Sequence, residues 1–166
     1  LDNENVLQFT SKQDLKKIRG CKLSMTFQEP MASFAPAINI GAQMVEQLLI
    51  QKNINTEEAK SISINMLKRV GIADAEKRFN QYAFELSGGM RQRAMIAMAL
   101  STMPKLLLAD EPTTALDVTI QAQVINLIKD IIKEYQMGVI FITHDLGVIA
   151  QVADHVAVMY LGRVVE

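Results

Sequence analysis

The feature of the sequence that most constrains the fold is the alternation of helical and strand patterns over residues 87–160. The spacing of apolar residues predicts helices at 88–102, 118–135 and 146–152, and short apolar runs predict strands at 105–110, 138–143 and 155–160. Strands that alternate with helices pair in parallel, because each helix carries the chain back to the start of the next strand. The sequence therefore predicts an α/β protein with a parallel sheet.

The first half of the chain combines short strand patterns with longer helical ones. The predicted elements are a strand at 6–9, a helix at 11–19, a strand at 22–27 and helices at 36–52 and 56–70. Thr56 is the predicted N-cap of the last of these helices, and Gly71 ends it. The two longer helices therefore form a helical insert between the strand at 22–27 and the alternating pattern that begins at residue 87.

Composition excludes several classes of protein. The chain has 166 residues, of which 49% are apolar, and this suits one globular domain with a substantial core. A net charge of −1 provides no field that would attract nucleic acid. The single cysteine, Cys21, excludes an internal disulfide, and no apolar run reaches the ~18–20 residues that cross a bilayer. The polar start Leu1-Asp2-Asn3 is no signal peptide, and we expect it to be a trimmed end.

The step Ser87-Gly88-Gly89 opens a predicted helix and is a candidate phosphate site. Glycines carry no Cβ, so the backbone N–H groups at an electropositive helix N-terminus can approach an anion closely. An isolated Ser-Gly-Gly is more often an N-cap with a flexible turn. Taken alone, these three residues leave both interpretations open.

Two carboxylates follow the apolar strand predicted at 105–110. Asp110 and Glu111 stand at the carboxyl end of the strand, where one carboxylate can hold Mg²⁺ and the other can act on a water molecule. The alternative is a solvated strand end. Adjacent carboxylates repel each other without a cation, and this repulsion favours the metal site.

Three further polar residues stand at the ends of predicted elements. Gln28 ends the strand at 22–27, and its amide can face Mg²⁺ or water, or simply cap the strand. His144 follows the strand at 138–143, where an imidazole can donate to a phosphate, although a lone histidine is more often a satisfied surface residue. Asp117 is by default the N-cap of the helix at 118–135. His155 has no comparable neighbourhood, and we interpret it as structural.

In combination and in this order, the motifs resemble the second half of the nucleotide-binding subunit of an ABC transporter. Ser87 lies 23 residues before Asp110, as the signature motif of that family precedes its Walker B aspartate. His144 lies 33 residues after Glu111, as the switch histidine of that family follows its Walker B glutamate. The implied fold is the core of a P-loop NTPase, with residues 1–29 and 87–166 in the lobe that contains the parallel sheet and residues 30–86 as the helical subdomain.

Two loops extend the resemblance, and one expected loop is missing. Phe27-Gln28-Glu29-Pro30 resembles the Q-loop, which makes Gln28 a hinge to the helical insert, and Ala115-Leu116-Asp117 resembles the D-loop. No Gly-x-x-x-x-Gly-Lys-[Ser/Thr] loop occurs in the 166 residues, although this loop holds the phosphates in P-loop NTPases. We therefore expect a fragment, truncated at its N-terminus, that is inactive by itself.

The resemblance implies ATP and Mg²⁺ as cofactors and assigns roles to the site residues. Asp110 and Gln28 would hold the metal, Glu111 would be the base for the attacking water, and His144 would bind the γ-phosphate. The residues implied to act across a head-to-tail dimer are Ser87, Gly88, Gly89 and Asp117. The first three would bind the γ-phosphate of ATP held by the opposite subunit, and the last would couple the two sites.

The residues that follow the signature glycines indicate a substrate class. Most of the family has Gln at the position of Met90, and Met90 with the run 91–100 resembles the D-type ATPase of oligopeptide and dipeptide importers and their nickel-importing relatives. Glu29, Phe34 and Ala35 depart from the Asp, Leu and Asn that are usual in the peptide importers. The implied function is ATP hydrolysis that drives the import of di- or oligopeptides, with nickel or another small solute as the alternative.

The implied partners are a second ATPase subunit, identical or different, integral-membrane permease subunits and, indirectly, an extracytoplasmic substrate-binding protein. The implied place is the cytoplasmic face of the cell membrane. Two rivals stand beside this interpretation. An ABC ATPase of translation or DNA repair predicts basic patches or coiled-coil insertions, which the sequence lacks. A non-hydrolysing interaction or dimerisation module predicts that cells make this short form deliberately.

The missing loop has a structural consequence. In the ABC family that this sequence resembles, the strand before this loop lies between the strands predicted here at 138–143 and 155–160. We therefore expect a gap or an exposed sheet edge at this place, filled by another chain, by rearrangement, or by disorder of the last strand.

Overall fold

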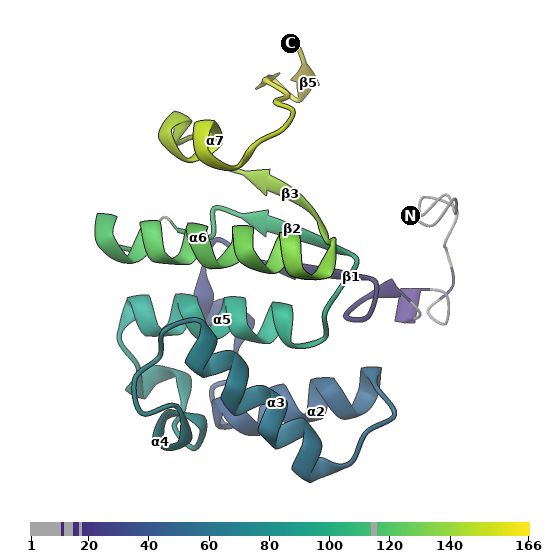
Figure 1. Ribbon diagram of the computed structural model, residues 1–166, viewed down its shortest axis with the longest axis vertical. Helices are drawn as coiled ribbons and strands as arrows, with labels where there is room; N and C mark the ends of the chain where they lie inside the picture. The colour runs from purple at the N-terminus through teal and green to yellow at the C-terminus, as the bar shows by residue number, and fades with distance from the viewer. Residues whose placement is uncertain (1–10, 12–14, 17, 114–115) are drawn as a thin grey trace.

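The computed structural model describes residues 11, 15–16, 18–113 and 116–166. Its centre is a three-stranded sheet in the order β1 (Leu23–Thr26), β2 (Leu106–Asp110) and β3 (Gly138–Ile142) (Figure 1). Both pairings are parallel, and they place Leu23 and Gly138 opposite Leu106. The carboxyl ends of the three strands therefore meet at one edge of the sheet. The predicted α/β class with a parallel sheet is confirmed.

The helices form two groups. α5 (Gly88–Ser101), α6 (Val118–Tyr135) and α7 (Leu146–Val152) alternate with the strands of the sheet. The second group contains α2 (Ile40–Gln51), α3 (Thr56–Arg69) and α4 (Ala75–Phe79), together with the 3₁₀ turns η2 (Pro30–Ser33) and η3 (Ala83–Glu85). α5 contacts both β1 and α3, so it lies between the sheet and the second group (Figure 1). In the part of the chain that the structure describes, no helix has the length and apolar character needed to span a membrane.

One hydrophobic core runs through the sheet and both helix groups. Its buried members include Met44 and Leu67 from the second group, Ile96 and Leu100 from α5, Leu107 from β2 and Ile128 from α6. Four consecutive residues of α5, 94–97, are buried, as expected of a helix that is covered on most sides. The order along the chain follows the predicted sheet, helical insert and sheet, while the division at residues 30 and 87 stays a prediction.

Several helix boundaries follow local capping rather than apolar spacing. α2 begins at Ile40 and not at 36, because the Asn39 side chain accepts the N–H of Ala42 at 2.7 Å and so caps the helix there. The N-cap of α3 is Asn55, which accepts from Glu58 N at 2.9 Å, so the prediction of Thr56 as the cap is wrong. Thr56 is the first residue of α3, so Asn55 occupies the capping position before it.

The ends of the chain differ most from the prediction. The strand predicted at 6–9 lies outside the described residues, as does part of the helix predicted at 11–19, in which Leu15, Lys16 and Ile18 are helical. The parallel strand predicted at 155–160 is wrong. In its place, β4 (Met159–Tyr160) and β5 (Arg163–Val164) form an antiparallel hairpin outside the main sheet.

The turn between β4 and β5 explains the hairpin. Leu161 and Gly162 both have positive φ angles, of 46° and 76°, the combination that a two-residue hairpin turn of type I′ requires. No described strand pairs with the outer edge of β3, where the side chains of Ile140 and Ile142 are 51% and 49% exposed. The expected exposed edge is therefore present at β3, and the last strand has rearranged.

Candidate functional site

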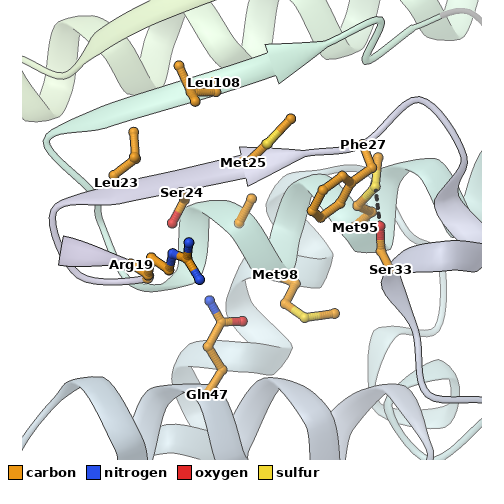
Figure 2. A pocket seen from close by; sticks show the side chains of 12 residues that line it. Arg19, Leu23, Ser24, Met25, Phe27, Ser33, Gln47, Met95, Met98 and Leu108 are labelled. Atoms are coloured by element: carbon orange, nitrogen blue, oxygen red, sulfur yellow. Dashed lines mark hydrogen bonds between the residues drawn. The ribbon is translucent and has the colours of Figure 1, made fainter. Parts of the chain in front are cut away.

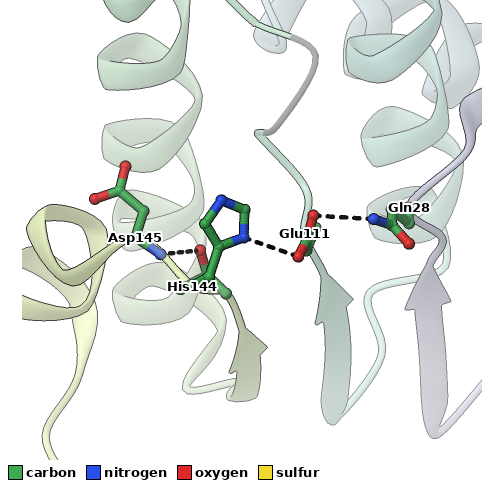
Figure 3. A network of polar contacts seen from close by, with 5 residues as sticks. Gln28, Glu111, His144 and Asp145 are labelled. Atoms are coloured by element: carbon green, nitrogen blue, oxygen red, sulfur yellow. Dashed lines mark hydrogen bonds and ion pairs between the residues drawn. The ribbon is translucent and has the colours of Figure 1, made fainter.

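Three of the predicted site residues meet at the carboxyl edge of the sheet. Gln28, Glu111 and His144 follow β1, β2 and β3, and the parallel register brings these strand ends side by side (Figure 3). We call these three residues the strand-end cluster. The sequence placed each of them at the end of a strand, and the structure shows that the three ends are neighbours.

Glu111 is the centre of the strand-end cluster. Its Oε2 accepts a hydrogen bond from Gln28 Nε2 at 3.1 Å, and its Oε1 lies 3.0 Å from His144 Nδ1 (Figure 3). A carboxylate only accepts, so Nδ1 is the donor and Nε2 of His144 is left to face a ligand. The Glu111 side chain is 20% exposed and that of His144 is 75% exposed. The cluster therefore holds a carboxylate, fixed by two contacts, next to an accessible imidazole.

The backbone at Glu111 is unusual. Its φ angle of 43° lies in the left-handed region, which residues other than glycine seldom adopt. The Glu111 N–H donates to the Ile142 carbonyl at 2.9 Å, and this bond continues the pairing of β2 with β3 by one residue. A non-glycine residue in this conformation is sustained only when its surroundings enforce it, and such residues occur at functional sites.

The turn that carries His144 is held by the next residue. Asp145 Oδ1 accepts from Gly147 N at 2.8 Å and so caps α7, while Asp145 Oδ2 accepts from Gln121 Nε2 at 3.1 Å. The bond from Gln121 is the main reason that the pKa of Asp145 is lowered, with the backbone N–H groups of α7 adding to it. Neither Asp145 nor Gln121 was among the predicted site residues, although an Asp between a strand and a helix is an N-cap signal.

Asp110 and Gln28 carry the oxygens that fit the expected metal. Asp110 ends β2 and is half-buried, and the Gln28 amide nitrogen is engaged with Glu111, which leaves the Gln28 amide oxygen for another partner. Carboxylate and amide oxygens are the ligands that Mg²⁺ prefers. Among the described residues, no group of three or more His, Cys, Asp or Glu side chains gathers as a metal site.

The other predicted residues form a second group at two helix starts. Ser87 Oγ accepts from Met90 N at 3.3 Å and caps α5, and Asp117 Oδ1 accepts from Ile120 N at 3.0 Å and caps α6. A Cβ built on Gly89 would lie 3.4 Å from a methyl carbon of Leu116, the residue before Asp117, so the two helix starts are neighbours. We call Ser87, Gly88, Gly89 and Asp117 the helix-start cluster.

The glycines of the helix-start cluster are not required by the packing of this chain. A Cβ built on Gly88 meets no atom of the described residues within 4 Å, and at Gly89 it would make an ordinary contact. Neither glycine has a positive φ angle. Glycine lowers helix stability relative to alanine, so the described residues give no packing reason for two successive glycines at this helix start.

A pocket lined by described residues lies away from these groups. It has a volume of 490 Å³ between β1, α5 and α2, and its lining includes Met25, Phe27 and Met98 but none of the predicted site residues (Figure 2). Ser33 Oγ donates to Met95 Sδ at 3.0 Å at one side of the pocket (Figure 2). The lining is mostly apolar and offers little chemistry, so the clusters, not this pocket, are the candidate site.

Comparison with known proteins agrees with the geometry. A family model described as "ABC transporter" matches residues 2–114. The oligopeptide transport ATP-binding protein AmiE of Streptococcus pneumoniae is 50% identical over 163 residues, which are 98% of this chain and 46% of AmiE. The oligopeptide transport ATP-binding protein AppD of Bacillus subtilis is 52% identical over 166 residues, which are 100% of this chain and 50% of AppD. The chain thus spans about half the length of the curated relatives it matches.

A solved structure has the same fold. The dimeric post-hydrolysis state of the ATP-binding cassette MJ0796, bound to ADP and Pi, shares 29% identity at a TM-score of 0.80, over 89% of this chain and 62% of that one. The expected ABC ATPase core is therefore confirmed. Because the family model covers most of the sequence and the relatives match nearly all of it, this chain belongs to the ABC transporter family.

Proposed function

We propose that the chain is part of an ATPase that energises the import of di- or oligopeptides. The observation that carries the proposal is the position of Glu111 between Gln28 and His144 at the carboxyl ends of three parallel strands. In open α/β sheets, ligands bind at this edge. The peptide substrate is supported by the names of the relatives AmiE and AppD, both described as oligopeptide transport proteins.

In this proposal, the strand-end cluster acts on the water that attacks the γ-phosphate. The Glu111 carboxylate orients the water and accepts its proton, and its two side-chain contacts keep it in place. His144 donates from its exposed face to the phosphate. Asp110 and Gln28 would hold Mg²⁺, which neutralises phosphate charge when bound.

The helix-start cluster supplies the complementary half of the site. Backbone N–H groups at Ser87, Gly88 and Gly89 would bind the γ-phosphate of a nucleotide held by a second ATPase subunit, and Asp117 would lie at the contact between the subunits. The space around Gly88 supports this arrangement, because no residue that the structure describes occupies it. The solved relative MJ0796 was described as a dimer bound to ADP and Pi.

The remaining partners follow from the proposed transport. We propose that permease subunits dock on residues 30–86 and on the segment after Gln28, and that an extracytoplasmic binding protein delivers the peptide to them. The chain would then work at the cytoplasmic face of the membrane. The 166 residues alone should hydrolyse ATP little, because no Gly-x-x-x-x-Gly-Lys loop is among them.

The test uses the natural gene product that contains this sequence, assembled with its transporter. Mg²⁺-dependent ATPase activity and uptake of labelled peptides are measured for the wild type, Glu111→Gln and His144→Ala. Each variant should keep ATP binding and lose roughly 10²–10³ in kcat. His155→Ala is the matched control, because His155 is exposed and lies outside both clusters.

Two results would contradict the proposal. Full turnover by Glu111→Gln would remove Glu111 from the reaction. Uptake of nickel or another small solute instead of peptides, at the same ATPase activity, would keep the ATPase and replace its substrate.

A further inference from the structure

A buried amide connects α5 to the residue that follows Glu111. Gln92 is 0% exposed, and its Nε2 donates to the carbonyl oxygen of Pro112 at 2.6 Å. The orientation of the amide is fixed, because a carbonyl only accepts and so requires the nitrogen side. The bond therefore holds the backbone directly after Glu111.

The other side of the Gln92 amide carries a cost. Among the described residues, no donor reaches Gln92 Oε1, although this atom is buried. A buried acceptor without a partner lowers stability. A methionine has a similar length and would avoid this cost, and methionines already fill the same helix at Met95 and Met98. Packing alone therefore gives no reason for an amide at this position.

The unusual backbone of Glu111 supplies a reason. Its left-handed φ of 43° is disfavoured and must be enforced from outside. On one side, Glu111 N donates to the Ile142 carbonyl at 2.9 Å. On the other side, the carbonyl of the following residue, Pro112, accepts from Gln92. These two hydrogen bonds bracket the residue whose side chain is held by Gln28 and His144.

We propose that Gln92 is a positioning residue for Glu111, an inference that rests on the proposed ATPase function. Through Pro112, Gln92 fixes the backbone conformation that aims the Glu111 carboxylate between Gln28 and His144. Gln92 also stands on the first turns of α5, the helix whose N-terminus carries Ser87 and Gly88. A phosphate bound at the start of α5 is thereby linked to the position of Glu111 through one side chain.

The experiment uses the natural gene product that contains this sequence and measures kcat and KM for ATP. Gln92→Met keeps the length of the side chain and removes the donor. It should lower kcat by roughly tenfold to 10²-fold, with KM for ATP within about threefold of the wild type, because a misplaced group affects the transition state more than binding. Ser101→Ala is the matched control, since Ser101 is buried on the same helix and its hydroxyl donates to the Met98 carbonyl of that helix at 2.8 Å.

A conservative variant separates positioning from general stability. Gln92→Glu carries a proton at low pH, because burial raises the pKa of a carboxyl group, and a protonated carboxyl can still donate to Pro112. Its kcat relative to the wild type should therefore fall as pH rises. This ratio keeps the inference testable even if Gln92→Met does not fold.

The outcomes are distinguishable. A Gln92→Met protein with the kcat of the wild type, or a Gln92→Glu ratio that does not change with pH, overturns the inference alone. Equal loss of kcat in Ser101→Ala also overturns it, because the effect would then be one of helix stability. A wild-type protein without ATPase activity overturns the proposed function and this inference with it.

Discussion

Gly41 in α2 offers a sharp test of the packing between the helices of the second group. It is buried, and a Cβ built on it would lie closer than 3.0 Å to three ring atoms of Phe79 in α4. Phe79 is itself buried in the core that also contains Met44 and Leu67. Gly41→Ala therefore forces the ring to move within a packed region.

Two opposing terms set the magnitude. Overpacking a well-filled core costs about 1–3 kcal/mol. Alanine is better than glycine within a helix by up to about 1 kcal/mol, and this gain offsets part of the cost. Gly41→Ala should therefore lower the free energy of unfolding by about 1–2 kcal/mol, although helix propensity alone predicts the opposite sign. For a chain of this size the melting temperature should fall by roughly 3–6 °C.

The assay is urea unfolding followed by circular dichroism, combined with a double-mutant cycle. Phe79→Leu removes the ring that meets the new methyl group, so Gly41→Ala should cost less in the Phe79→Leu background, with a coupling of about 0.5–2 kcal/mol. Gly88→Ala is the control, because a Cβ there meets no atom within 4 Å in the part of the chain that the structure describes. Unchanged or increased stability of Gly41→Ala, or additive costs in the cycle, would refute the packing argument.

Two further predictions concern the site. Gly88→Ala should leave the free energy of unfolding within about 0.5 kcal/mol of the wild type, because the added methyl group meets no described residue. It should nevertheless reduce ATPase activity in the transporter, because the methyl group would meet an approaching ligand. Equal loss of stability and activity would contradict this. The lowered pKa of Asp145 means that its ionised form stabilises the folded state above the usual value of 3.8, and that this stabilisation is lost as pH falls through the lower folded value. Melting curves should therefore show wild type above Asp145→Asn at about pH 6, with the gap closing toward about pH 3; a constant gap would reject the role of the charge.

The sequence predicted the central sheet well because local pattern and tertiary structure agree there. Apolar runs bounded by turn residues identified β2 and β3, and the spacing of apolar residues identified α6 with its Asp117 cap. The parallel arrangement then followed from the helices between the strands. Gln28, Glu111 and His144 could be placed at strand ends for the same reason, since a strand end is a local feature and the register of a parallel sheet makes strand ends neighbours.

What the sequence did not predict depends on competition between local signals or on contacts across the fold. Asn55 and Thr56 are both good N-caps, and only the structure shows that Asn55 is used. A hairpin replaces the strand predicted at 155–160, and the positive φ angles of Leu161 and Gly162 form its two-residue turn. The role of Gln92 was not predicted, because no local sequence pattern indicates a buried amide whose partner lies 20 residues further along the chain.

The strand-end cluster and the helix-start cluster differ in the contacts that this chain supplies to each of them. Both carboxylate oxygens of Glu111 are engaged by side chains of the same chain, whereas no described residue lies within 4 Å of a Cβ built on Gly88. The strand-end cluster is thus arranged before a ligand arrives, and the proposed function gives the helix-start cluster a second subunit as its partner. In a symmetric dimer, each complete site would then take Glu111 from one chain and the N-terminus of α5 from the other.

Mixing two inactive variants tests this arrangement directly. In a mixed dimer of Glu111→Gln and Gly88→Ala chains, one site contains both substitutions and the other contains neither. Random assembly makes half of the dimers mixed, so an equal mixture of the two variants should recover about a quarter of the wild-type ATPase rate, whereas each variant alone keeps only its own reduced rate. A mixture as inactive as its components would show that Glu111 and Gly88 do not serve one site across two copies of this chain.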